Sequence, residues 1–196
     1  MKKWLPLIII VVILIGIFRW GVGLNNTMVE KQETARTQWA NVESAYQRRS
    51  DLIPNLVSTV KGYADFEKET LEGVIQARAN ATKTTIDPSN ITPEQMAQFQ
   101  ESQNSLSGAL SRLMVVVERY PDLKANQNFL ELQSQLEGTE NRINVERNRF
   151  NTVAKDYNIY IKKFPASVVA GFLNFDEMAL FQAAAGSEQA PEVNFD

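Results

Sequence analysis

Hydrophobic residues recur along this chain in alternating steps of three and four positions. That spacing places them on one side of an α-helix and is typical of helices that pack lengthwise against one another. We call such a row a seam, and the sequence contains three. The first seam is Ala35, Trp39, Val42, Tyr46, Arg49, Ile53, Leu56, Val60 and Tyr63. The second is Met96, Phe99, Gln103, Leu106, Leu110, Leu113, Val117 and Tyr120, and the third is Phe129, Leu132, Leu136, Thr139, Ile143, Glu146, Phe150, Val153, Tyr157, Tyr160 and Phe164. The pattern predicts a left-handed bundle of long antiparallel helices.

The first seam predicts a helix over residues 28–81, on the order of 80 Å long at the usual rise per residue. The stretch SDLIP at 50–54 interrupts it, because Asp51 is an acceptable N-cap and Pro54 would fit the first turn of a new helix. The spacing of the seam passes through this stretch unchanged, which favours a kinked but continuous helix. A reversal of the chain at 51–54 is the alternative, and it would give four antiparallel helices.

The later helices have clear end signals. Thr92, Pro93 and Gln95 form a capping box with proline in the first helical position, and Pro121 is expected to stop the second helix. The tight connector DLKAN at 122–126 makes the third helix return antiparallel beside the second. That helix is expected to end at FP, 164–165, and a short helix is expected at 166–173.

An apolar run precedes the seams: LPLIIIVVILIGIF at 5–18. The run is shorter than the roughly 18 residues of a spanning helix, but extending it from Trp4 to Leu24 supplies the length and places Trp4 and Trp20 at the two interfaces. A cleaved signal peptide is the alternative. Because GVGL at 21–24 is a poor cleavage site, a retained anchor is favoured.

These patterns divide the chain into a transmembrane anchor at 1–27, a helical bundle at 28–184 and a flexible acidic tail at 185–196. The predicted fold class is all-α, with one N-terminal transmembrane helix followed by a long-helix antiparallel bundle of three to four helices. A short tail with Lys2 and Lys3 is hard to translocate, although Arg19 lies on the other side of the span. We therefore expect the N-terminus inside and the bundle outside the cytoplasm.

Composition restricts the chemistry. The 196 residues include no cysteine and no histidine, which excludes disulfides, thiolate nucleophiles, imidazole bases and the common zinc and di-iron ligand sets. A formal charge of −3 argues against nucleic acid as a partner, because phosphate binding requires concentrated Lys and Arg. We expect no cofactor and no metal, since the carboxylates of the third helix lack the Asp-rich loop of a calcium site. Those carboxylates are Glu131, Glu137, Glu140 and Glu146.

Several short motifs, in order along the chain, resemble those of the LemA family of bacterial membrane proteins. They are YQRRSDLIPNLV at 46–57, VKGYA at 60–64, YPDLKAN at 120–126, TENRI at 139–143, RNRFN at 147–151, YN at 157–158 and FP at 164–165. The resemblance covers about residues 28–181. It implies a membrane helix and a bundle in the bacterial inner membrane, with no established enzymatic activity. A relative in magnetosome-forming bacteria is associated with building an internal membrane.

Four seam positions are polar: Arg49, Gln103, Thr139 and Glu146. We interpret them as residues that pair across the core and fix the register of the helices. Within its own helix Glu146 can reach Arg142 and Arg149. Across helices, up-down-up packing is expected to place Glu146 near Arg78 rather than Arg49. The candidate buried polar pairing is Glu146, Arg78, Arg142 and Arg49.

Two other clusters are interpreted as structural. The basic residues Arg142, Arg147 and Arg149 have the chemistry to hold a phosphate or an acidic lipid headgroup, but the polar residues between them favour a solvated helix face. The aromatic stripe at the end of the third seam is expected to be core, as aromatic stripes at helical spacing usually are. It consists of Tyr157, Tyr160 and Phe164.

A continuous first helix would leave residues 28–53 as a stalk without a partner in its own chain, because the second helix would return only to the level of Leu56. The stalk carries an apolar stripe that must be covered in water. This stripe, the candidate oligomer interface, is Ala35, Trp39, Val42 and Tyr46. The sequence thus predicts a membrane-anchored, non-enzymatic scaffold that contacts the lipid bilayer, forms a homo-oligomer and organises membrane or partner proteins. An accessory subunit of a membrane-bound enzyme or signalling complex is the alternative.

Overall fold

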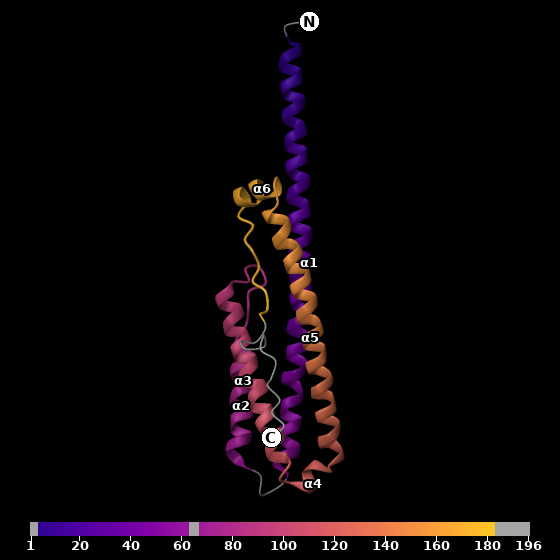
Figure 1. Ribbon diagram of the computed structural model, residues 1–196, viewed down its shortest axis with the longest axis vertical. Coiled ribbons are helices and arrows are strands. Elements are labelled where there is room, and N and C mark those ends of the chain that lie inside the picture. Colours follow the sequence, from indigo (N-terminus) through magenta and orange to yellow (C-terminus); the bar gives the residue numbers. More distant parts are fainter. Residues whose placement is uncertain (1–3, 63–66, 183–196) are drawn as a thin grey trace, which may run out of the picture.

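One helix, α1 (Leu5–Lys61), joins the apolar N-terminal stretch to the helical bundle without a break. The structure is a computed structural model that describes residues 4–62 and 67–182. In Figure 1, α1 stands clear of the other helices over its N-terminal part and is flanked by them over the rest. In the part of the chain described, α1 is long and apolar enough to cross a membrane. Its first fully buried side chain is Met28.

Four long helices form the bundle. After α1 the chain reverses into α2 (Lys68–Lys83), reverses again into α3 (Pro93–Val117), makes the single turn α4 (Pro121–Lys124), and returns as α5 (Gln127–Lys162). A short helix, α6 (Ala166–Leu173), follows α5. α1 packs chiefly against α5, and α2 packs chiefly against α3. The predicted all-α bundle is confirmed, and over residues 4–62 and 67–182 four long helices form it.

The end signals read from the sequence are confirmed at α3. The Thr92 side chain accepts a hydrogen bond from the Gln95 amide at 3.2 Å, and the Gln95 side chain accepts one from the Thr92 amide at 3.2 Å. This capping box satisfies amides that the first turn of a helix leaves without partners. Asn126 caps α5 by accepting a hydrogen bond from the Phe129 amide at 3.1 Å. These local interactions fix where the two helices begin.

The first helix continues through Pro54, as favoured from the sequence, but it ends at Lys61 and not at about residue 81. The reversal falls between Gly62 and Lys68, and Tyr63 of the first seam lies outside the described residues. The buried residues Val74, Ala77 and Ala81 of α2 continue the three-and-four spacing of the first seam. An unbroken spacing therefore did not exclude a reversal, because each of two antiparallel helices needs only a buried stripe of its own.

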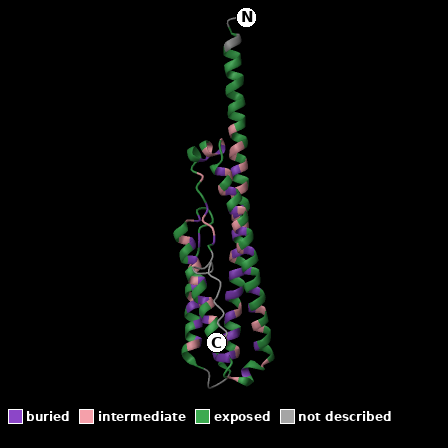
Figure 2. Ribbon diagram, in the orientation of Figure 1, coloured by how far each residue is buried: buried purple, intermediate pink, exposed green. Residues whose placement is uncertain are grey.

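The prediction of an unpartnered stalk at 28–53 is wrong. α5 has 36 residues against 25 in α3, so it is about 16 Å longer and continues along α1 beyond the start of α3. Because the chain reverses before α2, α5 runs back toward the apolar end of α1 instead of away from it (Figure 1). Figure 2 shows buried residues on the facing sides of these helices and exposed ones along the N-terminal part of α1. The predicted tail at 185–196 lies outside the described residues.

Candidate functional site

Two hydrophobic cores follow one another along the bundle. The core nearer the apolar end of α1 includes Trp39, Phe99 and Phe150, and the core nearer α4 includes Ile53 and Leu113. Among the described residues, the buried polar side chains are Arg49, Ser50, Gln103, Thr139 and Glu146. Four of these are the polar seam positions, and Ser50 was not anticipated. We call the group formed by Arg49, Ser50, Gln103 and their partners the polar layer, because it lies between the two cores.

Arg49 is the centre of the polar layer. Its guanidinium donates hydrogen bonds to Gln103 Oε1 at 2.7 Å, to Glu140 Oε2 at 2.8 Å and to Ser107 Oγ at 2.9 Å. Gln103 Nε2 in turn donates to the carbonyl of Ala81 at 3.3 Å. These bonds join α1, α2, α3 and α5 at one level of the bundle. Any other alignment of the helices would leave the buried guanidinium without hydrogen-bond partners, at a high cost in free energy. The layer therefore fixes the register of the four helices.

The polar layer also explains how α1 tolerates Pro54. Proline has no amide hydrogen, so the carbonyl of Ser50, four residues earlier, loses its helical partner. Arg78 of α2 replaces that partner, because its Nε donates to the Ser50 carbonyl at 2.8 Å. The expected pairing of Arg78 with Glu146 is therefore wrong. It depended on a helix continuing to residue 81, whereas the reversal after Lys61 brings Arg78 back beside Ser50.

A double-mutant cycle tests this arrangement. Arg78→Leu is expected to lower the free energy of unfolding by about 1–3 kcal/mol, because it leaves a buried carbonyl unpaired. In a Pro54→Ala background the same change is expected to cost clearly less, because alanine restores the amide donor to that carbonyl. Urea unfolding of the four proteins gives the coupling. The exposed Arg112→Leu on α3 is the matched control, expected to change stability by less than about 0.5 kcal/mol. Additive effects of Pro54→Ala and Arg78→Leu would contradict the replacement.

Glu146 is buried between α5 and α1. Its Oε2 accepts a hydrogen bond from Gln38 Nε2 at 2.7 Å, and its Oε1 lies 3.2 Å from Arg149 and 3.7 Å from Arg142. The two arginines are those that helical spacing placed within reach. Gln38 was not identified from the sequence, because its partner is on another helix. With these three contacts the charge of Glu146 is balanced locally.

The three arginines of α5 do not converge on one anion site. Arg142 and Arg149 pair with Glu146. The Arg147 guanidinium lies 4.6 Å from the ring centre of Phe181. Arg142 also lines an open polar groove of about 730 Å³ between α1 and α5, together with Arg48 and Asp51. In the described residues no group of three acidic side chains is placed to hold a metal ion.

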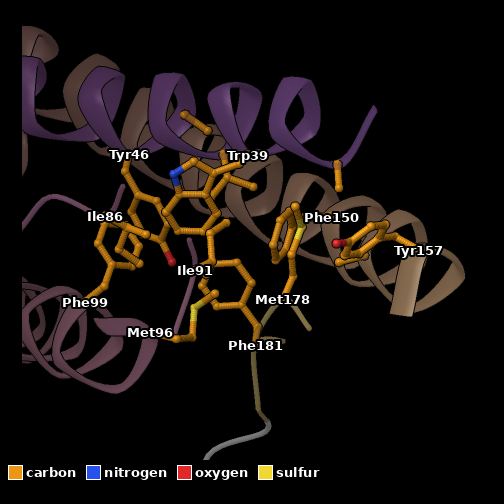
Figure 3. Close-up of a cluster of buried hydrophobic side chains, with 14 of the residues drawn as sticks. Trp39, Tyr46, Ile86, Ile91, Met96, Phe99, Phe150, Tyr157, Met178 and Phe181 are labelled. Carbon is orange, nitrogen blue, oxygen red and sulfur yellow. The ribbon is translucent and has the colours of Figure 1, made fainter. Parts of the chain in front are cut away.

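The four residues of the candidate oligomer interface lie inside the subunit. Ala35, Trp39 and Val42 have no exposed surface and Tyr46 has 7%. Figure 3 shows Trp39 of α1 surrounded by rings from other segments. Its ring centre lies 5.4 Å from that of Phe99, 5.2 Å from that of Phe150 and 5.7 Å from that of Phe181. An intersubunit contact through these side chains would require this core to open, so the argument for an oligomer through them no longer holds.

Sequence reasoning did not identify what holds the segment after α6 against the bundle, or that this segment covers Trp39. Asn158 of α5 exchanges two hydrogen bonds with the backbone of Met178, at 2.8 and 2.9 Å, and Asn151 does the same with Phe181, at 3.0 and 2.9 Å. Seven residues of a helix rise about 10 Å, and three residues of an extended segment span about the same distance. The spacing of the two asparagines along α5 therefore matches the spacing of Met178 and Phe181. The two asparagines, seven residues apart inside the RNRFN and YN motifs, were the available signal.

The aromatic stripe of α5 is only partly core. Tyr157 is fully buried, Tyr160 is half-buried and Phe164 is 83% exposed. The buried positions at this end of the helix are Ala154, Tyr157 and Ile161. The row drifts because a straight helix has 3.6 residues per turn and not the 3.5 of an ideal seam. Phe164 lies beyond the end of α5 at Lys162, in the turn before α6, and is not held against the core.

Tyr157 predicts a pH dependence of stability. The pKa of its phenol is raised to about 12, chiefly by burial and to a smaller extent by the Asp176 carboxylate, while Arg36 acts in the opposite direction. The hydroxyl donates to the Asp176 carbonyl at 2.9 Å. Between about pH 10, the ordinary pKa of tyrosine, and the pKa of the folded state, the unfolded chain loses this proton while the folded chain keeps it. Stability present below pH 10 is therefore lost as the pH rises toward 12.

Comparison with Tyr157→Phe isolates this effect from the titration of lysines. We expect the wild type to be the more stable protein below pH 10, by about 1 kcal/mol for the hydrogen bond. Its advantage is expected to shrink progressively above pH 10. Urea unfolding at a series of pH values measures the difference. A constant difference up to pH 12 would contradict the raised pKa.

The fold and this interior define a class of protein: a four-helix bundle with a buried polar layer, continuous with an N-terminal helix of membrane-spanning length and composition. The chain belongs to the LemA family, whose model matches residues 38–195. The match begins one residue before Trp39 and includes every member of the polar layer. The family expected from the motifs is confirmed.

Three relatives illustrate the similarity. Protein LemA of Metamycoplasma hominis is 27% identical over 178 residues, which cover 90% of this chain and 78% of the relative. Magnetosome protein MamQ 2 of Paramagnetospirillum magneticum is 26% identical over 174 residues, and magnetosome protein MamQ of Magnetospirillum gryphiswaldense is 25% identical over 173 residues. Each of these two alignments covers 80% of this chain and 64% of the relative. The chain therefore spans less than two thirds of the length of the magnetosome relatives.

Proposed function

We propose that this protein is a membrane-anchored, non-enzymatic scaffold of the bacterial inner membrane. The observation that carries the proposal is the continuity of α1: the same helix exposes an apolar surface over its first four turns and then enters the bundle core at Met28. A helix without a break transmits position and orientation, so the bundle is held at a fixed place relative to the bilayer. The magnetosome relatives support a role connected with a membrane compartment.

The interior supports a structural role over a catalytic one. Among the described residues, the buried charged side chains are hydrogen-bonded to other side chains, Arg49 to Gln103 and Glu146 to Gln38, and the half-buried Arg78 is bonded to the Ser50 carbonyl. Such pairing holds helices in register and uses the groups that an active site would need. We propose that the scaffold contacts its partners through its outer faces, where the polar groove beside Arg48 and Arg142 is one concave surface. Self-assembly remains part of the proposal, through surfaces other than the buried stripe of Trp39.

Membrane attachment is tested by deletion of residues 1–24. We expect the full chain to stay with membranes during an alkaline carbonate wash, and the shortened chain to be released while keeping its helical circular dichroism. The reason is that the described core begins at Met28 and does not need the anchor. The shortened chain is expected to unfold in a single cooperative step. A shortened chain that remains bound to washed membranes, or a full chain that is released, would contradict anchoring by α1.

Orientation and partners are tested in cells. The absence of native cysteine makes Arg48→Cys, on an exposed part of α1, a clean site for a membrane-impermeant maleimide. Labelling of cells with a permeabilised cell envelope and an intact inner membrane supports a bundle outside the cytoplasm. Labelling only after the cells are lysed contradicts it. Affinity purification from solubilised membranes separates the two functions. Assemblies of this chain with several proteins support the scaffold, and one stoichiometric enzyme favours an accessory subunit.

A further inference from the structure

The short helix α6 exposes an apolar surface that a water-facing helix would not need. Its sequence, ASVVAGFL, has no charged side chain. Ala166 and Ala170 are buried against the bundle. Val168 is 64% exposed, Phe172 is 85% exposed, and Phe164 just before the helix is 83% exposed. Large apolar side chains gathered at this density on a surface indicate a contact that is not with water.

α6 lies beside the part of α1 where the apolar span ends. An open apolar groove of about 690 Å³ separates them, lined by Phe18 and Val22 of α1 and by Val169 and Leu173 of α6. Figure 1 shows α6 at the end of the bundle from which the N-terminal part of α1 emerges. The exposed surface of α6 is therefore continuous with the exposed apolar surface of α1.

The composition of α1 gives the level of the membrane surface. Its dense run of exposed apolar residues ends at Trp20 and Val22, and the polar residues Asn25, Asn26 and Thr27 follow. Tryptophan is enriched at the boundary between headgroups and acyl chains, and polar side chains follow on the aqueous side. The boundary thus crosses α1 at the residues that α6 packs beside.

We propose that α6 inserts into the bilayer on the side of the bundle, with Val168 and Phe172 among the outer parts of the acyl chains. This inference rests on the proposed anchoring by α1. With 8 residues, α6 is too short to cross the bilayer, so it lies in the interface. With α1 as the first attachment and α6 as the second, the bundle cannot tilt freely relative to the bilayer, which orients its other faces for partners.

The charges beside α6 are of both signs. Lys162, at the end of α5, pairs with Glu177 at 2.7 Å, and Lys163 and Asp176 are their neighbours in sequence, so the formal charges on the two sides of α6 balance. Insertion then depends on burial of apolar surface, which a zwitterionic bilayer supplies as well as an anionic one.

Spin labels on single cysteines test the insertion in the full chain. The native chain has no cysteine, so each variant carries a single site for a nitroxide label. The four variants are Val11→Cys, Val168→Cys, Phe172→Cys and Val115→Cys, and each is labelled and reconstituted in phosphatidylcholine vesicles. Val115 on α3 is the matched control, because this valine is 71% exposed and does not lie on α6. The measurement is the ratio of relaxation by oxygen, which concentrates in acyl chains, to relaxation by a water-soluble nickel chelate.

We expect a high ratio at Val11→Cys, a clearly raised ratio at both α6 sites and a low ratio at Val115→Cys. A low ratio at both α6 sites with a high ratio at Val11→Cys would overturn the insertion of α6 and leave the anchor intact. A low ratio at Val11→Cys would instead overturn the anchoring itself. Poor access of both reagents to the α6 sites would show that protein, either a second copy or a partner, covers the helix, and would also overturn the inference.

Discussion

Replacing Trp39 with alanine is expected to lower the free energy of unfolding by about 3–5 kcal/mol, a large fraction of the stability of a domain this size. Trp39 has no exposed surface and lies where α1, α3, α5 and the segment ending at Phe181 meet (Figure 3). Removing the indole therefore leaves a void that four segments would have to move to fill. Urea unfolding of the full chain in detergent micelles, followed by circular dichroism, measures the loss.

Two controls decide where Trp39 acts. Val115→Ala removes part of a side chain that is 71% exposed and is expected to change stability by less than about 0.5 kcal/mol. The unfolding midpoint of Trp39→Ala is expected to be independent of protein concentration, and the oligomeric state is expected to be that of the wild type. A midpoint that rises with concentration, or a changed oligomeric state, would return Trp39 to an intersubunit interface.

Arg49→Ala is expected to have an effect of similar size, about 3–5 kcal/mol, because truncating one member of a buried polar group leaves the others unpaired. Only 3% of Arg49 is exposed, and its partners Gln103 and Ser107 lie on a different helix. Glu140 is expected to matter much less. Its side chain is 48% exposed, so Glu140→Ala is expected to cost less than about 1 kcal/mol.

The adjacent Arg48→Ala serves as the matched control, because it removes the same kind of side chain from an exposed position of α1, and a change below about 0.5 kcal/mol is expected. Replacing Arg49 and Gln103 together with leucine is expected to recover part of the loss, because the buried guanidinium and its buried amide partner are removed together and only the Ala81 carbonyl and the Ser107 hydroxyl lose a donor. If Glu140→Ala costs as much as Arg49→Ala, the ion pair and not the buried hydrogen bonds carries the effect.

The sequence by itself determined the buried face of the bundle part of α1 and most of the buried faces of α3 and α5. All eight described positions of the first seam are buried, from Ala35 to Val60. The capping box at Thr92 and the polar seam positions were also legible, because helical periodicity and capping depend on residues a few positions apart. The continuity of α1 through Pro54 followed from the spacing, although the residue that makes it possible, Arg78, did not.

Only the tertiary structure decided what covers each buried face. The spacing of the first seam continues into α2 despite the reversal after Lys61, so it predicted one long helix where there are two. That single difference turned the stripe of Trp39 from an expected surface into a core, and moved Arg78 from Glu146 to the Ser50 carbonyl. Phe181 is held beside Trp39 by hydrogen bonds of its backbone to Asn151, which is 30 residues earlier in the chain. Periodicity predicts that a side chain is buried. Which residues bury it depends on where the chain reverses and on contacts between residues distant in sequence.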